Sequence, residues 1–244
     1  EYGRPVLARA QGPNSPHVLV MTVDGIINSV KEGFISRAID QAEEDGAELL
    51  IIQLDTPGGL LSSTREIVEL LLESPVPVAI YVSPKGARAG SAGTFITAAG
   101  NFAVMAPGTN IGAATPISAT GEDLEDTLAS KVENDAAALI RSIAQTRGRN
   151  EDKLEETVRS AASYSAQEAL ADNVVDLIAE DLDDLLAKLE GPTADTLLGM
   201  FALETEGLEL RIIEQIILEH FREFISDPTL SFILLTIGGL VFLV

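Results

Sequence analysis

The sequence predicts an α/β domain in which a mostly parallel sheet is covered by helices on both faces. Short aliphatic segments alternate along the chain with longer amphipathic segments, which is the pattern of strand–helix–strand units. The aliphatic segments are continuous runs of Val, Ile and Leu, as at 49–54, and such runs suit strands that are buried on both faces. With 244 residues and 46% hydrophobic content, the chain can also bury a substantial core.

The predicted elements follow one another from His17 onward. The first half of the body reads as strand, helix, strand, helix, strand, with breaks at Asp45-Gly46, Pro75 and Pro77. A short helix of small residues, a strand and a Gly/Thr/Ser-rich loop come next, before a long helix, a strand and a last helix. The predicted strands are 17–25, 47–55, 76–83, 101–108 and 174–179, and the predicted helices are 29–46, 60–74, 91–100, 127–147 and 181–191.

The C-terminal part of the chain has a different pattern. From Leu208 to Ile225, apolar residues recur at helical spacing with glutamates between them, which predicts an amphipathic connecting helix or a dimer seam. After Asp227 the sequence is uncharged and mostly apolar, which predicts the start of a transmembrane helix; a C-terminal helix buried in the core is the alternative. We therefore divide the chain into an N-terminal tether (1–16), the α/β body (17–190), a connecting segment (191–227) and the start of a transmembrane helix (228–244).

The charges near this apolar segment bear on where the body lies. Only Arg211, His220 and Arg222 offer positive charge beside it, against many acidic residues. The rule that cytoplasmic flanks are rich in Lys and Arg therefore gives no support for a cytoplasmic position, and we expect a membrane-attached domain outside the cytoplasm. Residues 1–16 are rich in Pro and Gly and resemble what remains after a signal segment has been removed or left out.

Composition argues against several classes of function. The 16 basic and 38 acidic residues give 16 − 38 = −22, a charge that repels nucleic-acid backbones. The chain has no cysteine and only two histidines, His17 and His220, so thiol catalysis and His/Cys metal centres are not expected. Phosphate-cradling glycine motifs are also missing from the sequence. We therefore expect neither a cofactor nor a metal ion.

Three loops rich in glycine and other small residues follow predicted strands, at 55–59, 85–93 and 106–112. Functional loops of α/β sheets gather at the carboxyl ends of the strands, so these three could converge. Ser91 is the candidate nucleophile among them, because it follows a loop and begins a helix whose first N–H groups would point toward a developing oxyanion. A serine in such a setting can equally be a packing contact or a helix N-cap.

Serine needs a base, and Lys131 is the best candidate. It lies on the flank of a predicted buried stripe, and partial burial favours the neutral amine that Ser–Lys hydrolases use. A lysine on a helix flank is otherwise usually solvated, so spacing alone leaves both interpretations open. Apart from Asp135, the stripe consists of apolar residues at three- and four-residue spacing: Leu128, Val132, Asp135, Leu139 and Ile143.

Four segments of the body carry a resemblance to a known family. They are TVDGIIN, LLIIQLDTPGGLLSSTREIV, SPVPVAIYVSPKGARAGSAGTFI and VMAPGTNIGAATPI. These segments resemble the NfeD family of membrane-bound, ClpP-class serine proteases, the stomatin operon partner proteins, and the similarity covers roughly residues 17–190. The resemblance implies a ClpP/crotonase-like fold and a Ser–Lys dyad that cleaves hydrophobic peptide segments.

The resemblance also implies roles for individual residues. The nucleophile motif matches Ser91, and the family's lysine matches Lys131. By analogy with ClpP-like enzymes, the N–H groups of Gly58 and Ala92 would stabilise the oxyanion, with Gly59 as the weaker assignment. Soluble ClpP-type proteases use a histidine, and the corresponding stretch 112–116 has none, which favours the Ser–Lys branch.

We therefore expect a membrane-anchored serine endopeptidase that acts on hydrophobic peptides. A stomatin-like membrane protein is the expected partner or substrate, and the chain is expected to form a homo-oligomer, most simply a dimer. One alternative is a catalytically silent scaffold that holds a stomatin-like protein in a hydrophobic cleft. Another is a crotonase-like acyl-thioester enzyme, which Ser91 and Lys131 disfavour because enolate chemistry typically uses carboxylates. The acidic run 122–126 is expected to be a solvated loop, which could lie over the site as a lid, and we assign it no function.

Overall fold

The computed structural model of the protein describes residues 16–117 and 126–226, which fall into two compact units. The first unit runs to Ile213 and the second begins at Glu214. The α/β body lies in the first unit, and the second contains helix α8 (Ile217–Ser226). The first unit therefore continues past the expected boundary at residue 190.

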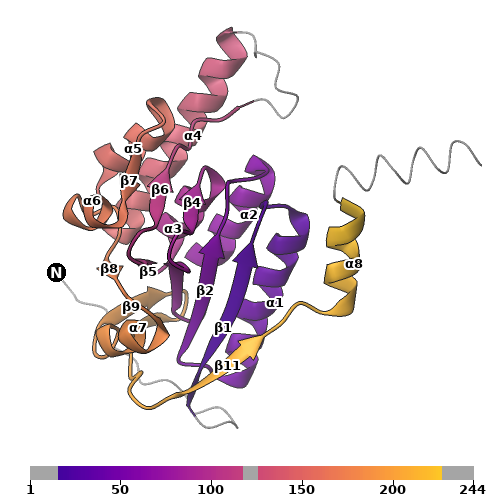
Figure 1. Ribbon diagram of the computed structural model, residues 1–244, viewed down its shortest axis with the longest axis vertical. Coiled ribbons are helices and arrows are strands. Elements are labelled where there is room, and N and C mark those ends of the chain that lie inside the picture. The colour runs from indigo at the N-terminus through magenta and orange to yellow at the C-terminus, as the bar shows by residue number, and fades with distance from the viewer. Residues whose placement is uncertain (1–15, 118–125, 227–244) are drawn as a thin grey trace, which may run out of the picture. The chain divides into compact units, whose positions relative to one another are not determined.

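A parallel sheet of six strands forms the centre of the first unit (Figure 1). Its strands lie in the order β11-β1-β2-β3-β5-β8, and every neighbouring pair is parallel. Parallel pairing requires a crossover between successive strands, which the predicted helices supply. The strands are β1 (His17–Asp24), β2 (Leu49–Asp55), β3 (Val78–Val82), β5 (Phe102–Met105), β8 (Leu177–Ile178) and β11 (Glu209–Ile213).

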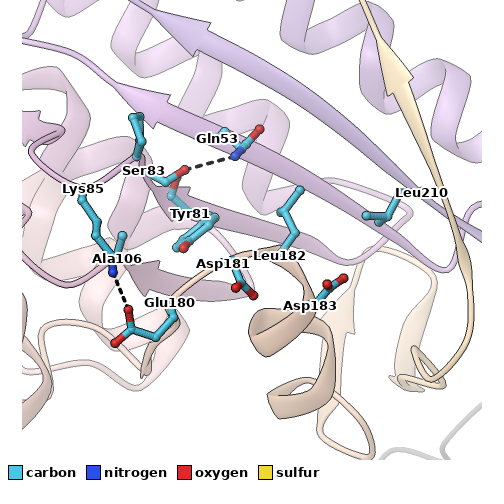
Figure 2. A pocket seen from close by; sticks show the side chains of 11 residues that line it. Gln53, Tyr81, Ser83, Lys85, Ala106, Glu180, Asp181, Leu182, Asp183 and Leu210 are labelled. Atoms are coloured by element: carbon cyan, nitrogen blue, oxygen red, sulfur yellow. Dashed lines mark hydrogen bonds and ion pairs between the residues drawn. The ribbon is translucent and has the colours of Figure 1, made fainter.

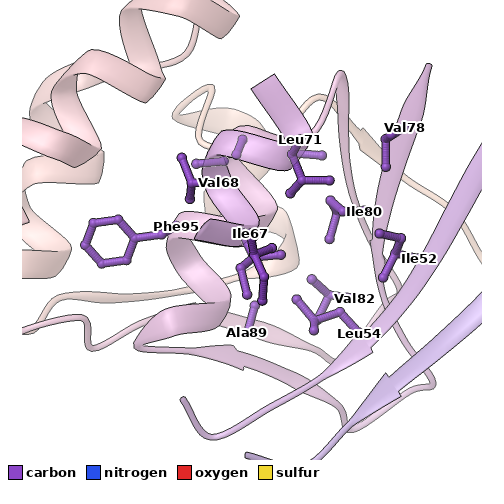
Figure 3. Close-up of a cluster of buried hydrophobic side chains, with 14 of the residues drawn as sticks. Ile52, Leu54, Ile67, Val68, Leu71, Val78, Ile80, Val82, Ala89 and Phe95 are labelled. Carbon is purple, nitrogen blue, oxygen red and sulfur yellow. The ribbon is translucent and has the colours of Figure 1, made fainter. Parts of the chain in front are cut away.

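Alternate residues of each strand face two different cores, because successive side chains of a strand point to opposite faces. Leu50 and Ile52 of β2 belong to the larger core, which helices cover, and Figure 3 shows side chains of α2, α3 and β3 converging there. Leu49 and Ile51 face the second core, together with helix α7 (Leu182–Lys188) and the hairpin of β9 (Thr193–Thr196) and β10 (Gly199–Ala202). Burial on both faces is thus confirmed. The helices that pack on the larger core include α1 (Ser29–Asp45), α2 (Leu61–Leu72), α3 (Ala92–Ala99) and α4 (Asp126–Arg147).

A second sheet of three short strands forms near the carboxyl ends of the main strands. It consists of β4 (Arg88–Gly90), β6 (Asn110–Gly112) and β7 (Ser163–Ser165). A bridge between Thr56 and Ala89 joins it to the segment that follows β2. The three predicted glycine-rich loops therefore converge, as expected. Helices α5 (Glu151–Arg159) and α6 (Ala166–Ala171), which the sequence did not predict, flank β7.

The prediction of a helix from Leu208 to Ile225 is wrong for the first part of this segment. Glu209–Ile213 is strand β11, which pairs with β1 at the edge of the main sheet. Leu210 packs against the smaller core and Ile213 belongs to the larger one, on opposite faces of the sheet. A helical spacing of apolar residues arises here because a short strand is followed by a helix.

Some expectations concern residues outside the described ranges. These are the transmembrane segment at 228–244, the tether apart from Pro16, and the acidic run apart from Asp126, where α4 begins. In the ranges that the structure describes, no helix combines the length and the apolar character needed to cross a bilayer.

Arg149 anchors the C-terminal end of α3, the helix that begins after Ser91. Its buried guanidinium donates hydrogen bonds to the carbonyl oxygens of Ala98 (2.6 Å) and Gly100 (3.1 Å), and it pairs with Asp176 (2.5 Å). A helix leaves its last carbonyls without partners inside the helix, so a cation at this end also complements the helix dipole. Arg149 thus fixes the helix from the end opposite the candidate nucleophile.

Replacing Arg149 by Lys should lower the free energy of unfolding by about 2–4 kcal/mol, because an ammonium group cannot reach all three acceptors and leaves buried polar groups without partners. Urea unfolding followed by circular dichroism measures the change. Lys85→Ala is the control, since it removes an ion pair with Glu180 that is exposed to solvent, and it should have a much smaller effect. An equally small effect of R149K would contradict the assigned role.

Candidate active site

Ser91 occupies a strained backbone position at the start of α3. Its φ of 48° and ψ of −110° are uncommon for a residue with a Cβ atom, and such strain collects at functional sites. The surroundings hold it in place: its N–H donates to the Gly112 carbonyl at 3.0 Å, and its carbonyl accepts from the Thr94 N–H at 3.0 Å. Strand β6 and helix α3 thus determine where the side chain lies.

The Ser91 hydroxyl does not cap the helix. It makes no capping hydrogen bond to α3, and no hydrogen-bond partner for it exists among the residues that the structure describes. The side chain is only partly buried. The alternative of a simple helix N-cap is therefore wrong, and the hydroxyl is available for another role.

Close packing explains the small residues around Ser91. A Cβ atom on Gly93 would lie 2.7 Å from Cγ2 of Thr56, and one on Gly90 would lie 3.0 Å from the Pro57 carbonyl oxygen. A Cβ atom on Gly58 would lie 2.7 Å from Cβ of Ser91 and 3.2 Å from its Oγ. The packing and the nucleophile interpretations of this glycine-rich segment are therefore compatible. The Pro-Gly-Gly loop lies directly against the hydroxyl.

Hydrogen bonds hold this loop to β4. The Thr56 N–H donates to the Arg88 carbonyl (2.8 Å), and the Gly90 N–H donates to the Thr56 carbonyl (2.9 Å). A carboxylate oxygen of Asp55 accepts from the Arg88 N–H at 3.0 Å. Asp55 thus orients the loop.

The three predicted oxyanion donors differ in availability. The Gly58 N–H donates to the Thr56 hydroxyl oxygen at 3.0 Å and is therefore engaged. The N–H groups of Gly59 and Ala92 have no acceptor in the described part of the chain. Ala92 is the first residue of α3, where a helical N–H lacks an internal partner. Among the three groups, the N–H groups of Gly59 and Ala92 are thus the ones that lack an acceptor in the described residues.

Lys131 does not lie in a buried position in this structure. Its side chain is exposed, and among the described residues it forms no ion pair and no hydrogen bond, including none to Ser91. The predicted buried stripe is confirmed only toward the C-terminal end of α4: Ile143 lies in the larger core and Leu139 packs against it, whereas Leu128 is 49% exposed. Ala136 and Ile140 also belong to the buried face of the helix. Ile140 follows Lys131 by nine residues, about two and a half helical turns, so the two side chains lie on opposite faces of the helix.

The first turns of α4 are held by ion pairs. Glu133 pairs with Arg159 of α5 at 3.1 Å, and Asp135 pairs with Arg65 of α2. Fully buried apolar contacts of this helix begin only at Ala136. Ion pairs that are open to solvent contribute little to stability. The segment that carries Lys131 is therefore less firmly attached than the rest of the helix.

Exposed apolar side chains lie beside the glycine loop. Ile26 is 59% exposed and Leu60 is 51% exposed, although both are large hydrophobic residues. Each adjoins a residue of the bridge between Ile27 and Gly59. An apolar surface is thus available next to Ser91.

A cavity that the described residues form lies away from Ser91. It has a volume of about 690 Å³ on the α7 side of the sheet, and its lining contains neither Ser91 nor Lys131 (Figure 2). Burial, followed by the carboxylates of Asp181, Asp184 and Glu180, raises the pKa of Tyr81 there to about 12. The Tyr81 hydroxyl donates to the Ala179 carbonyl at 2.8 Å, which suits a structural role. In the described ranges, no three His, Asp or Glu side chains are placed to hold a metal ion.

Sequence reasoning missed two buried threonines beside Ser91. Thr94 Oγ1 lies 3.1 Å from the carbonyl oxygens of both Ala89 and Gly112, and Thr56 contacts Gly58. Both side chains are completely buried. A threonine next to glycines carries no pattern that distinguishes it from a turn residue, so no sequence signal could have identified them.

Comparisons with known proteins agree with the expected family. Residues 17–196 match the model of the family described as NfeD1b, N-terminal domain. The chain is 38% identical over 226 residues to the membrane-bound protease PH1510 of Pyrococcus horikoshii, an alignment that covers 91% of this chain and 51% of that protein. The chain thus spans about half the length of that curated relative.

Solved structures show the same similarity. A lysine-to-alanine variant of the 1510-N membrane-bound stomatin-specific protease, in complex with a substrate peptide, has a TM-score of 0.79 and 35% identity, covering 87% of this chain and 98% of that one. A serine-to-alanine variant of 1510-N has a TM-score of 0.77 and 36% identity, covering 83% and 100%. ClpP1 from Listeria monocytogenes has a TM-score of 0.56 at 18% identity, covering 68% and 94%, which shows the fold alone. The expected ClpP-like α/β fold is thus confirmed.

Proposed function

Because the chain belongs to the NfeD1b N-terminal domain family, we propose that it is a serine endopeptidase in which Ser91 is the nucleophile and Lys131 is the base. One observation carries the proposal: a strained serine with an unengaged hydroxyl lies against a Pro-Gly-Gly loop and at the N-terminus of a helix. The solved serine and lysine variants of a related protease add support.

The proposed reaction proceeds through an acyl-enzyme. Ser91 Oγ attacks the scissile carbonyl carbon while its proton moves to the neutral amine of Lys131. The N–H groups of Gly59 and Ala92 donate to the resulting oxyanion. When the C–N bond breaks, the leaving amine takes the proton from Lys131. A water molecule then attacks the ester, Lys131 accepts its proton, and Ser91 is released with its hydroxyl restored.

The base must approach Ser91 for this reaction. Lys131 is exposed in the single chain, so the first turns of α4 have to move toward the glycine loop. Such a movement breaks the two ion pairs of Glu133 and Asp135 but no fully buried apolar contact, since these begin at Ala136. Its cost is therefore small compared with unfolding part of the core.

The substrate class follows from the surface beside Ser91. Ile26 and Leu60 would contact the residues that flank the scissile bond, and burying them stabilises an apolar peptide more than a polar one. The related 1510-N enzyme is a stomatin-specific protease. We propose a similar specificity for the present chain, which would cleave apolar segments of a stomatin-like membrane protein. The chain would act as a membrane-attached domain outside the cytoplasm.

A pair of peptides tests the substrate class. An apolar peptide of about ten residues should be cleaved with a kcat/KM at least tenfold higher than a peptide in which the two leucines nearest the cut are replaced by asparagine, because each lost apolar contact costs about 1–3 kcal/mol. Mass spectrometry of the products gives the rates and the cut position. Equal rates for both peptides would refute the apolar specificity.

A catalytically silent scaffold is the second candidate, and the exposed Lys131 favours it. A scaffold would bind the apolar peptide without cleaving it. Isothermal titration calorimetry combined with product analysis separates the two candidates, because only a peptidase converts the peptide that it binds.

A further inference from the structure

The Thr56 side chain forms two hydrogen bonds with the backbone of Gly58. Its hydroxyl accepts a hydrogen bond from the Gly58 N–H at 3.0 Å and lies 3.1 Å from the Gly58 carbonyl oxygen, to which it donates. Thr56 is completely buried, so water does not compete for either contact. From this geometry we infer that Thr56 is a positioning residue that aims the Gly59 N–H at the oxyanion, an inference that rests on the proposed function.

Gly58 needs such support because its backbone is unusual. Its φ of +128° lies in a region that residues with a Cβ atom rarely adopt. Glycine tolerates this conformation but also leaves it easily, since no side chain restricts its rotation. The Gly58 carbonyl accepts a second hydrogen bond from the Ile27 N–H at 2.9 Å. Thr56 and Ile27 together hold Gly58 in a single conformation.

The orientation of Gly58 determines that of the next N–H group. The peptide between Gly58 and Gly59 is planar, so in the trans form the Gly59 N–H points opposite to the Gly58 carbonyl. That carbonyl points toward Ile27, on the side of β1. The Gly59 N–H therefore points away from β1, toward the side on which Thr56 pairs with β4 and on which Ser91 follows.

Thr56 also contacts the helix that begins after the nucleophile. A Cβ atom on Gly93 would lie 2.7 Å from Thr56 Cγ2, so the methyl group packs directly on α3. A β-branched side chain has few rotamers, and in the one adopted here the methyl group contacts α3 while the hydroxyl bonds Gly58. One side chain thus sets the oxyanion loop relative to the nucleophile helix.

The variants Thr56→Val and Thr56→Ser test this role in the complete chain, with the apolar peptide as substrate. Valine keeps the shape but lacks the hydroxyl, and we expect kcat to fall about 10- to 100-fold with KM changed less than about twofold. An oxyanion donor acts mainly in the transition state, and loss of one complete donor lowers kcat about 10²–10³-fold. Serine keeps the hydroxyl and should retain kcat within about threefold.

The outcomes separate this inference from the proposed function. A parent chain that cleaves no peptide overturns both. An active parent whose T56V variant keeps its kcat, or whose T56S variant loses as much as T56V, overturns the role of Thr56 alone. If Thr56 had only a structural role, its replacement by valine would lower the melting temperature but would not lower kcat selectively while leaving KM nearly unchanged. If T56V does not fold, Thr56→Ala replaces it, since it also lacks the hydroxyl and adds no atoms.

Discussion

Replacing Ser91 by Ala should abolish peptide cleavage, with a loss of at least about 10⁴ in kcat, because Oγ forms the covalent bond to the substrate and no other group can replace it. The hydroxyl has no hydrogen-bond partner among the described residues, so its removal breaks no hydrogen bond. The variant should therefore melt within a few degrees of the parent. Product analysis by mass spectrometry and a thermal melt measure the two effects.

Ser83→Ala is the matched control for this experiment. Ser83 lies in the loop that leads toward β4, but its hydroxyl contacts Gln53 and Tyr81 on the α7 side of the sheet. Loss of the Ser83 hydroxyl should leave the cleavage rate within about threefold of that of the parent chain. Cleavage by S91A at the parental rate would eliminate Ser91 as nucleophile, whereas an inactive parent that still binds the peptide would favour the scaffold.

Periodicity predicted most of the main sheet and its helices. The two-sided burial of the strands is visible in continuous aliphatic runs, as at Leu49–Leu54, and the helices between them are separated by clear breaks. The position of Ser91 was predictable for the same reason, since a strand, a loop and a helix of small residues place it at the carboxyl edge of the sheet.

Features that depend on distant parts of the chain could not be predicted. Strand β11 is defined by its pairing with β1, nearly the whole body away in sequence, and its own apolar pattern continues into a helix. The buried face of α4 is made partly of Ala136, Ala137 and Ala144, and alanine does not stand out in a hydrophobic pattern. The role of Thr56 depends on the backbone angle of Gly58, which composition does not encode.

Replacing Lys131 by Arg should lower kcat by at least about 10³-fold. Arginine keeps the positive charge and a similar length, but it stays protonated at any usable pH and cannot accept the proton of Ser91. Folding should be unaffected, because the side chain at 131 is exposed. Lys85→Arg is the control, since Lys85 is also exposed and pairs with Glu180. A K131R variant with the parental rate would exclude Lys131 as base.

A mixture of two inactive variants identifies the chain that supplies the base. We expect equal amounts of S91A and K131R, unfolded and refolded together, to remain inactive, because residues 113–125 link Gly112, the acceptor of the Ser91 N–H, to the beginning of α4. Because Ser91 and Lys131 belong to one chain, the lysine of the same chain has a high effective concentration at Ser91. Recovery of roughly a quarter of the parental activity would instead mean that Lys131 of one copy serves Ser91 of another. In that case the exposed position of Lys131 in a single chain would be its working position, and the dimer would be the active form.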